Sequence, residues 1–442
     1  MPVVRDRSLA GEPGARASGL AIHTRRQIAL RLLPFVFVLY IANYLDRTSV
    51  AYAALEMSRD LGFSDRVFGM GAGIFFVGYV ALQIPGALMV EHWSARRCIA
   101  IIMVAWGSLT ALTGVVHTAG QLYAARLVLG AAEAGFFPGV VVYLSHWFIR
   151  EDRAKATSNF MAAVPLSFII ASPMAGWIVG RHWLNVEGWR WLFILEGLPA
   201  VLLGVAAFFY LTDWPTQAHW LRPQQREWIV KTLEKEKPAD VGRVTWRQAL
   251  TSRQVLLLAA AAFPAYFASY AMIFWFPTIL KRLSGLSNQN IGLLGAIPYL
   301  AALAAMLING WHSDKRGERR IHAALPLFIG GIGLTGLLAW HGPLWLTVAL
   351  FSMVGIVQSF LAPFWALPTE ILGESAAATA VGFINAFASI AGFAGPFAFG
   401  YLNTRTGNLT AGLTVMLVCC LGSGLLLLCA PEAPKSALQG NW

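Results

Sequence analysis

Apolar residues gather along this chain in twelve long runs, separated by short stretches rich in charged residues, glycine or proline. About 20 consecutive apolar residues form a helix long enough to cross the hydrocarbon core of a bilayer. We therefore predict an all-α polytopic membrane protein. The predicted spans are 32–54, 67–90, 98–117, 121–146, 157–180, 190–211, 255–280, 290–311, 322–340, 343–366, 375–400 and 409–430.

One long polar interval, Thr212–Arg253, divides the twelve spans into two sets of six. The predicted organisation is a disordered N-terminal segment, a first six-helix half, a central loop, a second six-helix half and a short tail. Their bounds are 1–31, 32–211, 212–254, 255–430 and 431–442. The first apolar run is too long for a cleaved signal peptide, so we expect it to stay as a signal anchor.

The composition fits a membrane protein, because 57% of the 442 residues are hydrophobic and only 12% are charged. Soluble domains average about 45–50% apolar and about 25% charged residues. The formal net charge of +11 comes from clusters between the apolar runs, with 24 Lys and Arg on one side of the predicted membrane and 7 on the other. This asymmetry predicts both termini and the central loop in the cytoplasm of an inner or plasma membrane protein, without a nucleic-acid partner.

Two of the predicted helices carry charges at membrane depth. Asp46 and Arg47 lie side by side in the first span, and Arg126 and Glu133 lie in the fourth. A charge in hydrocarbon costs about 2.5–3.5 kcal/mol or more, so such residues face a bundle interior and are functional by default. Neighbours on a helix point about 100° apart, so Asp46 and Arg47 should face different helices. Arg126 and Glu133, seven residues apart, should share one face.

A repeated motif marks the expected cytoplasmic ends of the two halves. Both copies combine an acid at a helix end with a tight turn and two arginines. The residues are Glu91, Arg96 and Arg97 in the first copy and Asp314, Arg319 and Arg320 in the second. We expect them to latch helices together at the cytoplasmic face rather than touch substrate. Parallel six-helix repeats are typical of one secondary-transporter architecture.

These motifs resemble those of the major facilitator superfamily. The second copy fits the signature G-x-x-x-D-x-x-G-x-R-R, whereas the first has Glu91 and Ser94 in place of Asp and Gly. The segment 126–139 is similar to the superfamily's fourth-helix motif, in which an Arg precedes Gly, an acid and Pro-Gly. The segments 43–47, 363–369 and 384–385 resemble the anion:cation symporter family, in its tartrate, phthalate and hydroxyphenylacetate group.

The resemblance implies proton-coupled uptake of an organic anion. It implies that Asp46 and Glu133 carry protons, and that Arg47 and Arg126 pair with them or bind the anion. Where the sugar-acid branch of the family commonly has a polar Gln in the fifth helix, this chain has Val164.

Aromatic and amide side chains are candidates to line the cavity. Those we assign to substrate binding are Tyr44, Tyr79, Trp365 and Asn385. For each tyrosine, packing or anchoring at the membrane interface is as good an interpretation as binding. The three glutamates near helix ends, Glu196, Glu370 and Glu374, are expected at the interface.

The sequence predicts a transporter and offers no motif for an enzyme. It lacks a Walker loop, a metal cluster and a nucleophile triad, so we expect no cofactor and no metal. We predict a proton-coupled symporter for a small organic anion that works as a monomer. The alternatives are an anion exchanger or uniporter of the same fold and a non-transporting sensor. At the level of the residues, the four intramembrane charges could instead form two ion pairs that only hold helices together.

Overall fold

The computed structural model describes residues 13–236, 252–339, 342–371 and 374–430. These ranges are helical apart from short turns and one small hairpin, which confirms the predicted all-α class. Within them, twelve helical segments are long and apolar enough to cross a membrane. Those segments are Gly19–Asp60, Asp65–His92, Ala95–Thr113, Ala119–Ser145, Arg150–Val179, Gly188–Tyr210, Arg253–Ser284, Asn288–Arg316, Arg320–Ala339, Leu344–Ile371, Ala380–Thr406 and Thr410–Leu428.

Some of these spans are built from more than one helix. The first half contains α1 (Pro13–Asp60), α2 (Asp65–His92), α3 (Ala95–Thr113), α4 (Ala119–Glu133), α5 (Phe136–Ser145), α6 (Arg150–Met161), α7 (Ala163–Val179) and α8 (Gly188–Tyr210). The connection contains η1 (Pro215–Gln217) and α9 (Pro223–Lys235). The second half contains α11 (Arg253–Ser284), α12 (Asn288–Arg316), α13 (Arg320–Ala339), α14 (Leu344–Gly355), η2 (Ile356–Phe360), α15 (Leu361–Ile371), α16 (Glu374–Thr406) and α17 (Thr410–Leu428).

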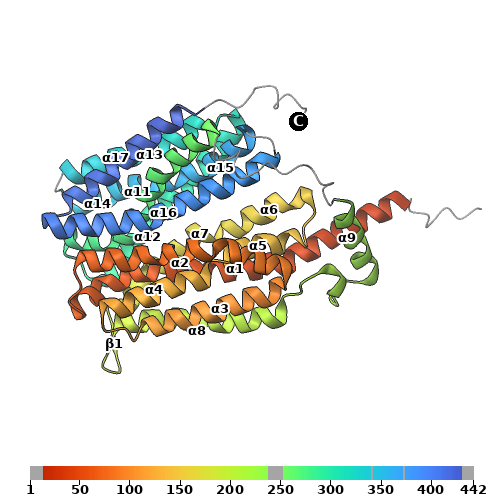
Figure 1. Cartoon of the computed structure of the whole chain (residues 1–442), viewed down its shortest axis with the longest axis horizontal. Coiled ribbons are helices and arrows are strands. Elements are labelled where there is room, and N and C mark those ends of the chain that lie inside the picture. Colours follow the sequence, from red (N-terminus) through yellow and green to blue (C-terminus); the bar gives the residue numbers. More distant parts are fainter. Residues whose placement is uncertain (1–12, 237–251, 340–341, 372–373, 431–442) are drawn as a thin grey trace, which may run out of the picture.

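A two-stranded hairpin follows α7. Strands β1 (His182–Trp183) and β2 (Val186–Glu187) are antiparallel, and His182 lies opposite Glu187. In Figure 1 the hairpin lies at one end of the molecule and α9 at the other, so the two mark opposite ends of the bundle.

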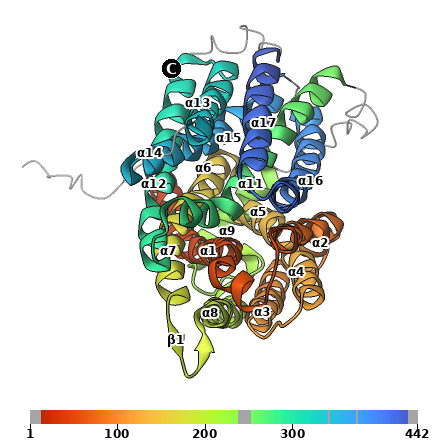
Figure 2. The ribbon, with the colours of Figure 1, turned by 90° about the vertical axis from the view of Figure 1, so that its left-hand side faces the viewer.

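The two halves lie against each other along their length (Figures 1 and 2). Closely packed glycines join α7 of the first half to α12 of the second. A Cβ atom added to Gly292 would lie 2.6 Å from the Ser172 carbonyl oxygen and 2.8 Å from the Gly176 Cα. Glycine at both positions therefore lets the two backbones approach, as in other membrane helix pairs.

Hydrogen bonds and ion pairs between the halves gather at the hairpin end of the described structure. Arg282 pairs with Asp65, and the Asn288 amide donates to Glu56 at 2.6 Å. Ser172 donates to the Gly292 carbonyl oxygen at 2.7 Å. At the α9 end, Arg25 pairs with Asp152 within the first half, and Arg319 pairs with Glu370 within the second half. Among the contacts of the described residues named here, those that join the two halves lie at the hairpin end.

The N-terminal region differs from the prediction. We expected residues 1–31 to be disordered, but α1 already begins at Pro13 and continues without interruption into the first span. The reason is tertiary contact: the Arg25 guanidinium donates to Asp152 of α6, and Gln27 donates to the Trp220 carbonyl oxygen beside α9. The predicted tail 431–442, like residues 1–12 and 237–251, lies outside the described residues.

We predict that Gly292→Val destabilises the protein by about 1–3 kcal/mol, because the new side chain must push apart two packed backbones. The measurement is thermal unfolding of the purified protein in detergent. Gly422→Val on α17 is the matched control, since a Cβ there has no neighbour within 4 Å. Equal melting temperatures for the two variants would contradict the glycine contact.

Candidate functional site

Arg47 and Glu133 form a buried ion pair between α1 and α4. The Arg47 Nε donates to Glu133 Oε1 at 2.8 Å, and a terminal guanidinium nitrogen reaches the same oxygen at 2.5 Å. Glu133 is fully buried and Arg47 is 9% exposed. Glu133 is the last residue of α4, and the helix breaks at Ala134 and Gly135 before α5 begins. The break places this carboxylate where the fourth span bends.

Asp46 turns to a different helix, as its position on α1 predicted. Thr110 of α3 donates its hydroxyl hydrogen to Asp46 Oδ1 at 2.8 Å. The other carboxylate oxygen, Oδ2, is buried without a hydrogen-bond partner among the described residues. The two adjacent charges on α1 therefore serve two different neighbours, α3 and α4.

Arg126 is the most unusual member of the group. It is fully buried in α4, and none of its three guanidinium nitrogens has a hydrogen-bond partner in the described part of the chain. Its guanidinium carbon lies 4.9 Å from the centre of the Phe75 ring. The alternative of two simple ion pairs therefore finds one pair in the described structure: Arg47 is paired with Glu133, whereas Arg126 donates no hydrogen bond to a carboxylate among the described residues.

Aromatic rings surround the two arginines. The Arg47 guanidinium lies 5.0 Å from the Tyr44 ring centre, 5.1 Å from Tyr79 and 5.5 Å from Phe75. Cations interact favourably with aromatic faces, the more so when water is excluded. The structure thus brings Tyr44 and Tyr79 to the charged group.

The second half presents its own aromatic group towards this region. Trp365 Nε1 donates to the Tyr266 hydroxyl at 3.1 Å, and the Tyr266 ring lies 6.0 Å from that of Tyr270. Tyr270 in turn contacts Phe76 of the first half at 4.6 Å between ring centres. Asn385 is half-buried on α16, and its backbone carbonyl oxygen accepts a hydrogen bond from Ser389. No contact between Asn385 and the four charged residues is described.

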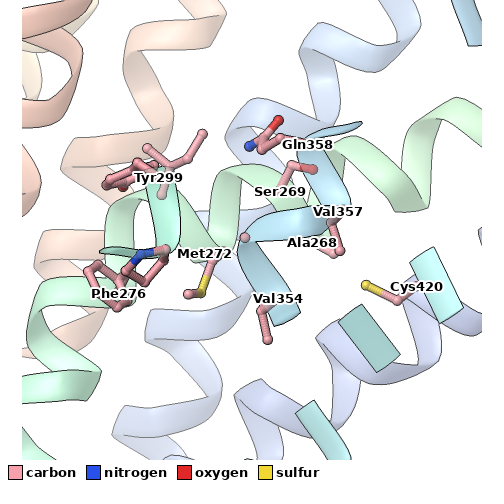
Figure 3. Close-up of a pocket in the computed structure, with 12 residues that line it drawn as sticks. Ala268, Ser269, Met272, Phe276, Tyr299, Val354, Val357, Gln358 and Cys420 are labelled. Carbon is pink, nitrogen blue, oxygen red and sulfur yellow. The ribbon is translucent and has the colours of Figure 1, made fainter. Parts of the chain in front are cut away.

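A small cavity lies in the second half (Figure 3), and none of the four charged residues lines it. It has a volume of about 20 Å³ and is lined by Met272, Tyr299 and Val354, with Ser269 and Gln358 on one side. This volume is enough for about one water molecule and not for an organic anion. The cavity is therefore not the substrate site.

Glu196 is a further candidate for the functional site, although its position near the start of a predicted span favours the membrane interface. Glu196 was expected at the membrane interface, but its side chain is 8% exposed and contacts the Ser49 hydroxyl of α1. The prediction was wrong because α8 begins at Gly188, so Glu196 lies more than two turns inside the helix. The side chain of Glu374 lies outside the described part of the structure.

The second copy of the repeated motif joins three helix ends. Arg319 donates to Glu370 of α15 at 2.8 Å and to Asp314 of α12 at 2.5 Å. Arg320 donates to the Ala430 carbonyl oxygen, just after α17, at 2.9 Å. These contacts join neighbouring helix ends, which is the role expected for the motif. The acceptor on α15 is Glu370.

The first copy uses an acid that sequence reasoning missed. The Ser94 hydroxyl and the Arg96 backbone N–H both donate to Asp213, which follows α8, at 2.8–2.9 Å. Glu91 is exposed, and so is the Arg97 side chain. Asp213 therefore supplies the carboxylate at the position we gave to Glu91. Asp213 was missed because it lies 119 residues after Ser94 in the sequence. Its position directly after the sixth span is the feature that could have identified it.

The comparisons with known proteins place this architecture in a family. The model of the Major Facilitator Superfamily matches residues 36–396. The chain belongs to the Major Facilitator Superfamily. It is a multi-pass membrane transporter rather than an enzyme.

Relatives and solved structures agree with this membership. A protein of Agrobacterium vitis named "Putative tartrate transporter" is 40% identical over 400 residues, covering 90% of this chain and 92% of the relative. A protein of Acinetobacter baumannii named "Quinolone resistance transporter" is 34% identical, covering 91% and 93%. A bacterial homologue of the human lysosomal transporter Spinster, solved in an inward-facing and occupied conformation, has a TM-score of 0.76 at 18% identity. The match covers 93% of this chain and 98% of that one. At this identity the solved structure supports the superfamily fold alone.

We predict that Arg47→Met destabilises this transporter by about 3–5 kcal/mol, because it leaves Glu133 buried without its partner. The double variant Arg47→Met with Glu133→Leu should recover most of that loss, since an apolar pair of similar volume replaces the ion pair. Thermal unfolding in detergent measures both. If the double variant is less stable than Arg47→Met alone, the two residues do not act as a pair.

Proposed function

We propose that the chain is a proton-coupled symporter that imports a small organic anion by alternating access. It would act as a monomer in an inner membrane, with both termini and the central connection in the cytoplasm. The observation that carries the proposal is Arg126, a fully buried guanidinium without a hydrogen-bond acceptor among the described residues. A buried guanidinium whose N–H groups lack acceptors can bind a carboxylate through two parallel hydrogen bonds.

Coupling to protons follows from competition for Arg47. In the described structure the Glu133 carboxylate occupies that guanidinium. A proton on Glu133 removes its negative charge and weakens the pair, so Arg47 can then bind a second carboxylate, that of the substrate. A substrate anion and a proton on Glu133 thus favour each other, as linked binding requires. Asp46, which faces α3 rather than α4, is the second proton carrier in this scheme.

The substrate class follows from the group around the arginines. Two guanidiniums suit a mono- or dicarboxylate, and the "Putative tartrate transporter" relative supports a compact dicarboxylate. The wall beside Tyr44 is apolar and aromatic, formed by Val164, Phe168, Tyr270 and Tyr299. This wall supports an aromatic acid over a polyhydroxylated sugar acid, which would need more hydrogen-bonding partners.

Three alternatives remain within the same fold. An exchanger or uniporter would move the anion without a net proton. The relative named "Quinolone resistance transporter" favours a second candidate substrate, a larger aromatic compound. A non-transporting sensor would bind the anion without moving it.

The experiment uses purified protein in liposomes that contain a pH-sensitive dye, with the membrane potential clamped. The external panel is tartrate, galactonate, phthalate, 4-hydroxyphenylacetate, nicotinate and a quinolone. We expect one carboxylate to acidify the lumen as it enters. An imposed gradient of one pH unit should then drive about tenfold accumulation per coupled proton. Glu133→Gln and Asp46→Asn should abolish this accumulation.

Glu227→Gln is the control, because Glu227 lies on the exposed face of α9 and pairs only with Lys231 in the described structure. It should leave acidification unchanged. Entry of a radiolabelled compound without any pH change would contradict symport and support exchange or uniport. Binding without entry would support the sensor.

A further inference from the structure

A third buried carboxylate lies next to the proposed proton site. Glu196 of α8 contacts the hydroxyl of Ser49, which lies one turn after Asp46 on α1. No arginine or lysine contacts the Glu196 carboxyl group in the described structure, and its Oε1 has no hydrogen-bond partner. By contrast, Glu133 is bound by Arg47. A buried carboxylate without a cation is costly unless it is protonated.

The hydrogen bonds around Ser49 indicate which group carries the hydrogen. The Ser49 hydroxyl lies 2.7 Å from the Leu45 carbonyl oxygen and also contacts Glu196 Oε2. A hydroxyl has one hydrogen to donate but can accept as well. If it donates to Leu45, the hydrogen between Ser49 and Glu196 must come from the carboxyl group. In that arrangement both contacts of Ser49 are hydrogen bonds only when Glu196 is protonated.

The charge balance of the buried group leads to the same state. Two arginines, Arg47 and Arg126, face three acids, Asp46, Glu133 and Glu196. The group carries a net charge of −1 when every member is ionised and is neutral with one proton. Neither Asp46 nor Glu196 contacts an arginine in the described structure, but the charges of Arg126 and Arg47 act on Asp46, whereas no arginine charge acts on Glu196. Glu196 is therefore the acid on which that proton costs least.

The charged groups around Glu196 are few. Helix α8 packs against α1, α3 and α7. On α1 the facing charge is Asp46, and Glu56, two turns beyond Ser49, is bound to Asn288. On α7 there is no charged residue.

The remaining charges of these elements lie further away. The arginines of α3, Arg96 and Arg97, lie more than three turns from Thr110. Arg190, on α8 itself, donates to the Gly114 and Val116 carbonyl oxygens. The proton affinity of Glu196 therefore depends first on its burial and then on the charge of Asp46, with the Ser49 hydroxyl as its hydrogen-bond partner.

We propose that Glu196 is a proton-binding residue of the transport cycle, protonated in the conformation described here and ionised in another, so that it adds one proton to those moved with each anion. This inference rests on the proposed symport. The competing explanation is a glutamic acid that stays protonated throughout and only packs α8 against α1.

Glu196→Gln separates the two explanations, because glutamine has the shape of a protonated glutamic acid but cannot release a proton. The measurement is the ratio of protons to anions, from the anion gradient that just balances an imposed pH gradient in liposomes. We expect one proton fewer per anion than in the wild type, and about tenfold less accumulation per pH unit. Glu227→Gln is again the matched control.

An infrared difference spectrum gives a readout that does not depend on transport. At a pH where the empty transporter has lost the Glu196 proton, the carboxylic acid C=O band of the wild type should increase when substrate is added, because anion and proton are carried together. The Glu196 part of this increase should be absent in Glu196→Gln. An unchanged proton-to-anion ratio together with an unchanged infrared difference would overturn the inference and leave the symport intact. A wild type without substrate-driven proton movement would overturn both.

Ser49→Ala keeps the test decisive if Glu196→Gln does not fold. Loss of the hydroxyl that accepts the Glu196 hydrogen disfavours the protonated acid. The pH of half-maximal uptake should then fall by about half a unit or more. A profile that does not move, or that moves towards higher pH, would contradict the assignment.

Discussion

The structure depends on how a few charges are kept away from water inside an apolar bundle. The Arg47–Glu133 pair joins α1 to α4, and the Asp46–Thr110 hydrogen bond joins α1 to α3. Buried ion pairs add little net stability, because each charge loses its hydration. Their presence at the centre of the first half is thus better explained by function than by stability. Arg126, without any hydrogen-bond acceptor in the described structure, is the extreme case.

The contacts between the halves complement this charged centre. At the hairpin end, backbones meet at Gly176 and Gly292, and Arg282 pairs with Asp65. At the α9 end, the motif arginine Arg319 binds an acid of its own half. In the proposed cycle, contacts of this kind would let each half move as a unit, as in other parallel-repeat transporters.

The sequence predicted the elements that hydrophobicity determines. The twelve spans, the two halves and the charges on the first and fourth helices all followed from apolar runs interrupted by ionisable residues. What it did not predict depends on tertiary contact. The extension of α1 depends on Arg25 meeting Asp152, Asp213 meets Ser94 from the far end of the first half, and Glu196 becomes a site residue only because Ser49 lies opposite. None of these pairings leaves a local pattern in the sequence.

The central claim is that the substrate carboxylate and a proton on Glu133 favour each other because both act on Arg47. Calorimetry of anion binding to the purified transporter, in buffers of different ionisation enthalpy and over a range of pH, tests this most directly. We predict proton uptake on binding, and an affinity that rises by about tenfold for each proton taken up when the pH falls by one unit. An affinity independent of pH, with a binding enthalpy independent of the buffer, would contradict the account.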